Sequence, residues 1–323
     1  MKKEILNIPT PFGEPLILYK NRWGPENGDD CLSIVSGLQG DRLNGLMVAS
    51  RLSRFLNDVE SGKETGYQIR GTIQIFPIVN YKAWETGNPV WTFDSQDADL
   101  TFPGMEVGEI TETVCNTVVQ HTSESEYGII LQTGEKHYED APHVKLIDPG
   151  RKRRNLSRGL CLPIGREVAE SPSLVLNLAK QWDLMGLHPF ILSAGKPQTY
   201  HAPYCDLLLD GIINFMRTEG LLSHNLEEVS QRAMAFFDAQ SEYPVLTREA
   251  GLFYREPAIG TVVQKGDKLG EVRDLYQGTV LEEIHTPEDG YVVTLRNHPI
   301  VYEKELVAVL LGEKNRRWFW PFG

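Results

Sequence analysis

Short apolar runs alternate with longer stretches of helical periodicity over residues 1–242. Cys31 to Val35 is a short, β-branched apolar run, which is typical of a buried strand. From Asn44 onward the apolar positions recur at helical spacing, at Leu46, Ala49, Leu52, Leu56 and Val59. We expect this stretch to form a helix that packs back on the strand. Gly37, Gly40 and Gly45 predict unusual φ values in the turn between them.

The same two patterns continue along the chain. Alternation around Pro11-Phe-Gly13 predicts a leading hairpin over residues 5–19. The apolar runs predict strands over 71–80, 127–133 and 188–193, and the helical patterns predict helices over 108–124, 171–186, 202–219 and 226–240. Ser171 and Pro172 suit the N-cap and first position of the third helix in this list. Residues 80–104 form a long predicted loop of the kind that is usually functional.

The pattern changes from Tyr243 onward to short strands and turns. Lys265-Gly-Asp-Lys-Leu-Gly270 and Pro287-Glu-Asp-Gly290 are hairpin signals of a small all-β domain. We therefore divide the chain into an α/β domain over 1–242, a β domain over 243–313 and a basic, aromatic tail over 314–323.

The turn after the first buried strand carries a family resemblance. Gly37-Leu-Gln-Gly-Asp-Arg42 resembles the metal-binding segment of the succinylglutamate desuccinylase and aspartoacylase family, relatives of the zinc carboxypeptidases. The family motif reads Gly-x-His-Gly-Asp/Asn-Glu, and its His and Glu bind zinc. In this sequence these two positions hold Gln39 and Arg42.

Four further blocks extend the resemblance to roughly residues 5–312, with frame residues such as Asn80, Ala83, Asp97 and Phe102-Pro-Gly104. Within them the functional positions of the family hold other side chains. The third zinc ligand falls on Gln132 and the catalytic glutamate on about Ser193. Of the substrate-binding positions, Asn80 is retained, whereas two arginines of the family fall on Pro89 and Leu100 and an Asn falls on Asp99. The resemblance implies a mixed sheet flanked by helices, as in zinc carboxypeptidases, followed by a small lipoyl-like β-barrel.

The side chains at the three ligand positions predict that this site holds no zinc. Gln offers a neutral carbonyl oxygen, and Arg keeps its positive charge and repels a cation. One hypothesis places the Arg42 guanidinium where the zinc would be, donating to the amide oxygens of Gln39 and Gln132, with Asp41, Asp97 or Asp99 as further partners. The alternative is that Arg42 extends into solvent after sequence drift.

Other residues offer weaker chemistry. Glu135, His137 and His143 form a ligand-like group, but scattered histidines on a polar loop are more often solvated. Ser193-Ala-Gly-Lys196 matches the S-x-x-K pattern by chance, because that motif requires a helix turn. His201 either borders the pocket or caps the following helix.

Composition limits the class of protein. The net charge of −12 argues against nucleic-acid binding. No apolar run reaches the length of a membrane span, and we expect a cytoplasmic protein with four reduced cysteines. Two surfaces remain as candidate contacts: the basic cluster of Arg151, Arg153 and Arg154, and the tail residues Trp318, Phe319, Trp320 and Phe322.

Three functional hypotheses follow. The first is a zinc-free pseudoenzyme, kept as a scaffold, binding module or regulatory subunit, with a protein partner or an oligomer. The second is a diverged amide hydrolase that acts on a small N-acyl amino-acid-like substrate. The third is a pocket that binds a small anionic ligand at Arg42 without turnover.

Overall fold

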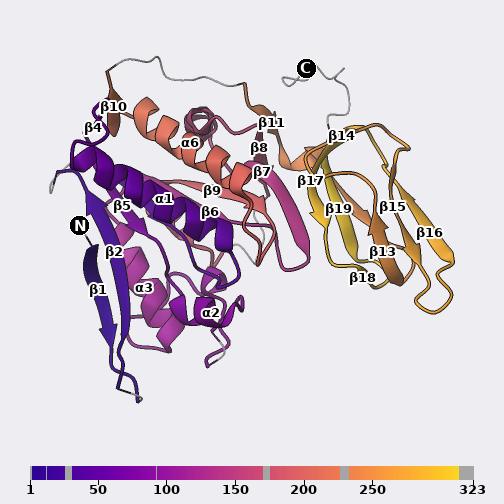
Figure 1. Ribbon diagram of the computed structural model, residues 1–323, viewed down its shortest axis with the longest axis horizontal. Helices are drawn as coiled ribbons and strands as arrows, with labels where there is room; N and C mark the ends of the chain where they lie inside the picture. The colour runs from indigo at the N-terminus through magenta and orange to yellow at the C-terminus, as the bar shows by residue number, and fades with distance from the viewer. Residues whose placement is uncertain are drawn as a thin grey trace.

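The structure, a computed structural model, describes residues 2–11, 13–25, 31–91, 93–169, 175–225 and 233–312. One large mixed sheet runs through it, with helices on both faces of its first part and an all-β region at the other end (Figure 1). A mixed sheet flanked by helices and followed by a small β region is what the sequence predicts, and this fold class is confirmed.

The large sheet has a path of ten strands. In spatial order they are β1 (Lys2–Ile8), β2 (Leu16–Trp23), β5 (Thr72–Phe76), β3 (Cys31–Val35), β6 (Tyr127–Gln132), β9 (His188–Gly195), β7 (Tyr138–Ile147), β17 (Gly290–Arg296), β19 (Leu306–Leu311) and β12 (Glu242–Leu246). β8 (Ile164–Val168), β11 (Ala235–Phe237) and β14 (Val262–Val263) join beside this path. β5, β3, β6 and β9 run parallel, so their carboxyl ends share one edge of the sheet.

Helices cover both faces of the parallel strands because those strands are apolar on both sides. On one face, α1 (Leu43–Glu60) packs beside α6 (Ala202–Thr218), and their apolar stripes close one core. On the other face, α3 (Ile110–Thr122) and α5 (Leu178–Leu184) close a second core. Two shorter helices, α2 (Tyr81–Thr86) and α4 (Arg151–Ser157), lie on connections.

The C-terminal region packs two β layers against each other. The smaller layer has the order β16 (Val280–His285), β15 (Lys268–Arg273), β13 (Gly251–Arg255) and β18 (Ile300–Val301). Its apolar side chains share a core with those of β17 and β19. The large sheet continues into this region, since Thr294 of β17 pairs with Asp140 of β7. A short pair, β4 (Tyr67–Ile69) with β10 (Leu222–His224), lies apart.

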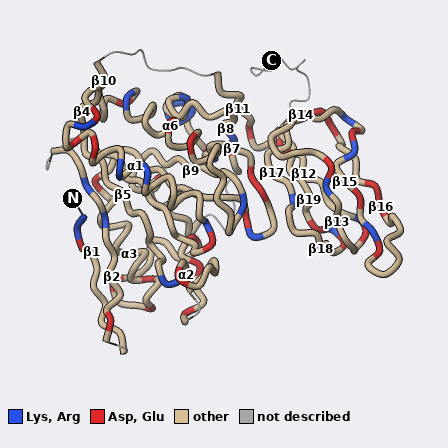
Figure 2. Tube along the Cα trace, viewed as in Figure 1, with Lys and Arg blue, Asp and Glu red and all other residues tan. Residues whose placement is uncertain are grey.

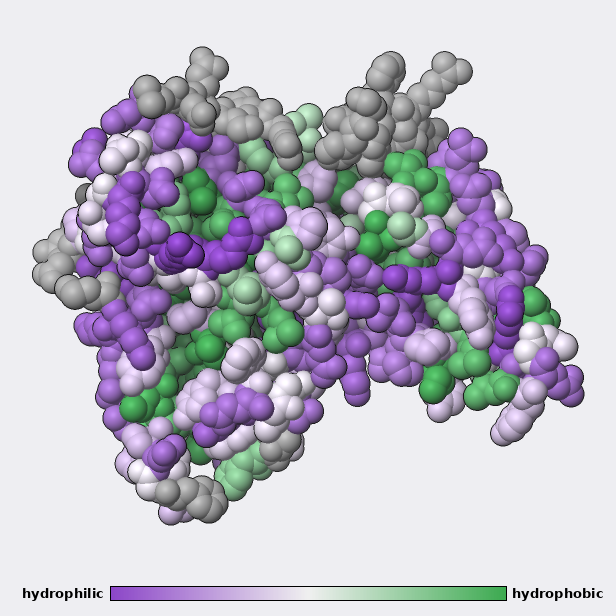
Figure 3. All heavy atoms as spheres, viewed as in Figure 1, coloured by the Kyte–Doolittle hydropathy of each residue, from purple (hydrophilic) through white to green (hydrophobic). Residues whose placement is uncertain are grey.

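The surface seen in this view is mixed. Figure 3 shows hydrophobic side chains gathered over the α/β part and at the far edge of the β region, with a hollow between these two parts. Within the part of the chain that is described, no helix is both long and apolar enough to cross a bilayer.

Several predicted elements need correction. The predicted loop 80–104 contains α2 and a 3₁₀ turn, η1 (Ala98–Leu100). The predicted helix 226–240 is wrong where it can be checked, because β11 and a second 3₁₀ turn, η4 (Ala239–Ser241), occupy its end. The helix expected over 171–186 is α5, which begins after the Asn177 cap; Ser171 and Pro172 lie outside the described residues.

The glycines of the turn after β3 act mainly through close packing. Only Gly37 has a positive φ, of 65°. A Cβ on Gly40 would lie 2.1 Å from the backbone carbon of Ala83 in α2, and one on Gly45 would lie 2.9 Å from the carbonyl oxygen of Leu131 in β6. These contacts let the turn, α1 and α2 approach the sheet edge closely.

Candidate functional site

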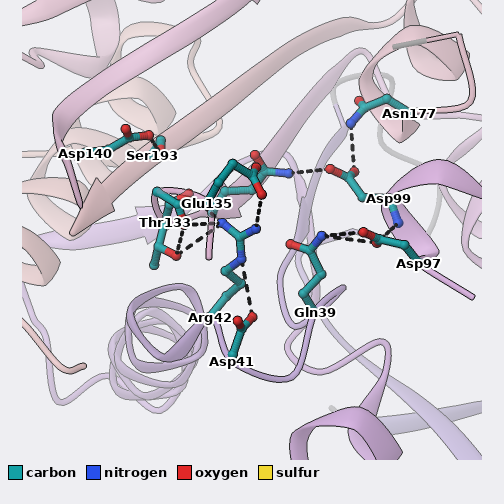
Figure 4. Close-up of polar contacts among 12 residues, drawn as sticks. Gln39, Asp41, Arg42, Asp97, Asp99, Thr133, Glu135, Asp140, Asn177 and Ser193 are labelled. Carbon is teal, nitrogen blue, oxygen red and sulfur yellow. Dashed lines mark hydrogen bonds and ion pairs between the residues drawn. The ribbon is translucent and has the colours of Figure 1, made fainter. Parts of the chain in front are cut away.

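The residues singled out by the sequence meet at the carboxyl ends of β3 and β6. The turn over 36–42 follows β3, and Thr133 to Glu135 follow β6. The 3₁₀ turn η1 brings Asp97 and Asp99 to the same place (Figure 4). Open α/β sheets keep their ligand sites at this edge, so the placement agrees with a ligand-binding site.

Arg42 is buried there, with 4% of its surface exposed. Its Nη1 donates to the carbonyl oxygens of Thr133 at 2.7 Å and Gly134 at 2.6 Å. Its Nη2 donates to Oε2 of Glu135 at 2.9 Å, and its Nε lies 3.4 Å from Oδ1 of Asp41. Two carboxylates and two carbonyls therefore surround a cation that cannot lose its charge.

The two glutamines donate hydrogen bonds to carboxylates instead of accepting them from Arg42. Gln39 Nε2 donates to both carboxylate oxygens of Asp97, at 2.9 and 3.1 Å. Gln132 Nε2 donates to Oδ2 of Asp99 at 2.8 Å, and Asn177 Nδ2 donates to Oδ1 of the same residue at 2.7 Å. Because a carboxylate only accepts, the NH₂ end of each glutamine faces its partner.

The predicted burial of Arg42 is correct, and of its predicted partners Asp41 is confirmed, whereas Gln39 and Gln132 are not. Among the described residues, no hydrogen bond joins Arg42 to the amide oxygen of Gln39 or Gln132. The alternative of an Arg42 side chain in solvent is wrong as well, because the side chain is buried. Of the predicted acidic partners, Asp41 lies beside the guanidinium, whereas Asp97 and Asp99 are bound by the glutamines.

Burial controls the protonation of the acidic side chains. Burial and, after it, the nearby Asp97 carboxylate together raise the pKa of Asp99 to about 7, against Arg42 and the hydrogen bond from Gln132. Burial also raises the pKa of Asp41, against the Arg42 charge. Asp99 is thus the carboxyl group of this site that changes charge near neutral pH.

Ser193, which falls at the position of the family's catalytic glutamate, forms a buried hydrogen bond. Ser193 Oγ donates to Oδ2 of Asp140 at 2.6 Å, and Thr294 Oγ1 donates to Oδ1 at 2.6 Å. Burial opposes the charge on Asp140, but Lys145, His143 and these two hydroxyls outweigh it and lower the Asp140 pKa. Ser193 and Asp140 lie away from the Arg42 cluster (Figure 4).

The ligand-like histidines do not come together. Glu135 binds Arg42, and His143 is buried beside the Ala141 carbonyl. The His137 ring lies tilted against the His298 ring, with the ring centroids 4.5 Å apart. Burial lowers the pKa of His143 to about 3, which keeps it neutral. His201 stands at the N-cap of α6, and its Nε2 lies 3.9 Å from Glu139.

The predicted substrate-binding residues differ in their surroundings. Asn80 caps α2 through its side chain, which accepts from the Ala83 amide at 3.1 Å. Pro89 is partly buried, and Leu100 is 49% exposed. Lys196, the partner required by the S-x-x-K pattern, bonds Asn297 instead of Ser193.

The basic cluster forms part of α4 and is mostly paired within the chain. Arg153 is buried, donates to the Ile147 carbonyl at 3.0 Å and pairs with Asp183. Arg154 pairs with Glu167, and Lys152 lies 3.7 Å from Glu126. Arg151 begins the helix and is exposed. The tail residues Trp318, Phe319, Trp320 and Phe322 lie outside the described residues.

The donor set does not fit the zinc ion that the resemblance implies. A permanent cation stands at one ligand position, and the two glutamines at the others turn their NH₂ groups toward carboxylates. In the described parts of the chain, no three His, Cys, Asp or Glu side chains are grouped as a metal site.

Comparison with known proteins places the fold. No protein-family model matches the sequence, and no curated protein sequence matches it. Among solved structures, the product-bound ectoine utilization protein of Ruegeria pomeroyi superposes with a TM-score of 0.80 at 17% identity, over 97% of this chain and 95% of that one. An aspartoacylase family protein of Mesorhizobium loti gives 0.79 at 18% identity, over 98% and 95%.

The chain has the succinylglutamate desuccinylase/aspartoacylase fold. A protein of that name from Rhodobacter sphaeroides agrees, with a TM-score of 0.79 at 16% identity over 97% of this chain and 96% of that one. The resemblance found in the motif blocks is thus confirmed for the fold along nearly the whole chain.

Sequence reasoning missed two parts of the network. The Thr133 and Gly134 carbonyls that hold Arg42 are backbone groups, which no residue pattern identifies. The second part is Asn177. Its side chain accepts from the Ala179 amide at 2.8 Å, so Asn177 is the N-cap of α5. An Asn just before an apolar helical stretch is the sequence signal that could have identified it.

Proposed function

We propose that this chain is a zinc-free, non-catalytic relative of the succinylglutamate desuccinylase/aspartoacylase family, kept as a scaffold, binding or regulatory subunit. Two observations support the proposal: the fold, and the contacts of the residues that stand at the family's functional positions. All the positions that would hold metal or the catalytic base carry side chains already committed to contacts within the chain.

The observation that carries the proposal is the buried Arg42. Its guanidinium takes the place in the motif of an acidic zinc ligand, and its Nη1 and Nη2 bond neighbouring groups. An approaching divalent cation would meet this charge at short range, in surroundings that screen charge weakly. The same burial argues against the hypothesis that Arg42 anchors a small anionic ligand.

An activity assay tests the proposal. The purified protein is incubated with a panel of N-acyl amino acids, with added zinc and with a chelator, and release of the free amino acid is measured. We expect no turnover in either condition. Turnover that requires zinc, and that a chelator abolishes reversibly, would refute the proposal.

The alternative is a diverged amide hydrolase, and one observation favours it. Asp99 has a pKa of about 7, which is suited to general acid–base catalysis at neutral pH. Both of its oxygens accept hydrogen bonds from Gln132 and Asn177, so substrate would have to displace one amide. Metal-independent turnover that is lost in Asp99→Asn but retained in Asp97→Asn would establish this alternative.

A further inference from the structure

A cavity of about 720 Å³ lies at the end of the sheet opposite to the candidate site. Its lining includes Cys31 and Thr72, the first residues of the parallel strands β3 and β5. The antiparallel strands β1 and β2 form one side, α3 contributes Gln120 and His121, and Glu124 lies just beyond the end of α3. The volume is within the range of about 300–1,000 Å³ that is typical of small-molecule sites.

Positive charge gathers in this cavity on a chain whose net charge is −12. Lys2, Lys3, Lys20 and Arg22 line it, against the two carboxylates of Glu60 and Glu124. Figure 2 shows the basic segments of β1 and β2 beside each other. Lys3 and Lys20 are direct cross-strand partners, an arrangement of like charges that destabilises a sheet unless something compensates.

Lys20 is the most buried of the basic side chains that line the cavity. It is only 7% exposed, and its Nζ donates to Oε1 of Gln74 at 2.7 Å and lies 3.4 Å from Nδ1 of His121. Within the described residues, Lys20 forms no ion pair. Burial lowers the pKa of Lys20, and Lys3 and Arg22 lower it further. A buried ammonium group with only neutral partners is costly to fold.

A row of polar groups on the floor holds this geometry. Gln74 Nε2 donates to Ser33 Oγ at 2.9 Å and to the His121 carbonyl at 3.0 Å, which turns its Oε1 toward Lys20. Ser33 in turn lies 2.6 Å from Ser125 Oγ. Apolar side chains would pack this layer at lower cost, so the row and the buried Lys20 point to a ligand that carries negative charge.

We propose that this cavity binds a small phosphate-bearing anion, with Lys20 and Lys3 as its charge partners. Two ammonium groups that reach one cavity from adjacent strands suit an oxyanion with more than one negative charge. The polar floor holds Lys20 in place through Gln74, so the two ammonium groups are the contacts offered to the anion. This site is independent of the candidate site and of the proposed function.

Binding of inorganic pyrophosphate by the intact chain tests the proposal. Thermal shift and calorimetric titration are run in buffers whose ionic strength is matched with sodium chloride. We expect pyrophosphate to raise the melting temperature of the wild type more than the matched salt does. We expect Lys20→Met to weaken pyrophosphate binding by at least about tenfold and Lys3→Met to weaken it severalfold.

Lys265→Met is the matched control, because Lys265 lies in the C-terminal β region and pairs with Glu288. It should bind pyrophosphate like the wild type. Lys3 is exposed, so Lys3→Met remains informative even where Lys20→Met fails to fold. The absence of any pyrophosphate effect on the wild type overturns the proposal. So does an affinity that stays unchanged in every folded cavity variant.

Discussion

Arg42 Nη2 donates to Oε2 of Glu135 at 2.9 Å, across the carboxyl ends of β3 and β6. The two partners differ in surroundings: the Arg42 side chain is 5% exposed and that of Glu135 is 70% exposed. The ion pair is therefore only the outer part of the contact. The Thr133 and Gly134 carbonyls bind the same guanidinium from the inside.

This asymmetry predicts unequal costs for removing the two partners. Arg42→Met would leave two buried carbonyls and the Asp41 carboxylate without their cation, and should lower the free energy of unfolding by about 3–5 kcal/mol. Glu135→Gln should cost less than about 1 kcal/mol because the pair is solvent-screened on that side. Urea denaturation measures both.

Arg54→Met is the control for the loss of an arginine, since Arg54 is 87% exposed on α1. It should change the free energy of unfolding by less than about 0.5 kcal/mol. Equal stability of Arg42→Met and Arg54→Met would mean that Arg42 does not hold the turn to β6.

The raised pKa of Asp99 predicts a pH dependence of stability. The folded chain keeps a proton that the unfolded chain releases between the ordinary value of 3.8 and about 7. Stability contributed by Asp99 should therefore be present at low pH and fall as pH rises through this window. Denaturation of the wild type and of Asp99→Asn at several pH values measures this contribution. As pH rises through the window, the free energy of unfolding of the wild type should fall relative to that of the variant. A difference that is independent of pH would contradict the raised pKa.

The buried contact of Ser193 predicts a structural effect. Ser193→Ala removes the 2.6 Å hydrogen bond to Asp140 and should cost about 1.5–3 kcal/mol in the free energy of unfolding. Lys196→Met, which alters the other end of the S-x-x-K pattern, should cost less than about 0.5 kcal/mol because Lys196 is peripheral. Equal costs in denaturation experiments would indicate that the two residues act as a pair.

The close approach of Gly40 to α2 predicts a packing defect. Gly40→Ala places a methyl group 2.1 Å from the Ala83 backbone carbon, and the resulting displacement of α2 should cost about 1–3 kcal/mol. Gly150→Ala is the comparison, since no atom lies within 4 Å of its added Cβ. Thermal unfolding should separate the two variants, and a Gly40→Ala protein as stable as Gly150→Ala would contradict the contact.

The sequence was informative where local pattern decides structure. The strand from Cys31 to Val35, the helix after Asn44 and the hairpin before them follow from periodicity alone, and the structure confirms them. The pattern failed for residues 235–241, because β11 is held by pairing with β8, a partner distant in sequence. The long strand β7 was missed for the same reason.

At the site, the sequence identified the altered positions but not their partners. That Gln39, Arg42 and Gln132 stand at the ligand positions of the family motif is a prediction from the motif spacing. Which groups they contact depends on backbone carbonyls and on the path of η1, which brings Asp97 and Asp99 across the sheet edge. Tertiary geometry of this kind leaves no trace in the local pattern.

The central claim is that Gln39, Arg42 and Gln132, at the ligand positions of the family motif, cannot bind a divalent cation. The most direct test is elemental analysis of the purified chain after saturation with zinc and exhaustive dialysis, beside the variant Gln39→His/Arg42→Glu/Gln132→His. We expect far less than one zinc per chain in the wild type and more in the variant. Near-stoichiometric zinc in the wild type that is lost on treatment with a chelator would contradict the account.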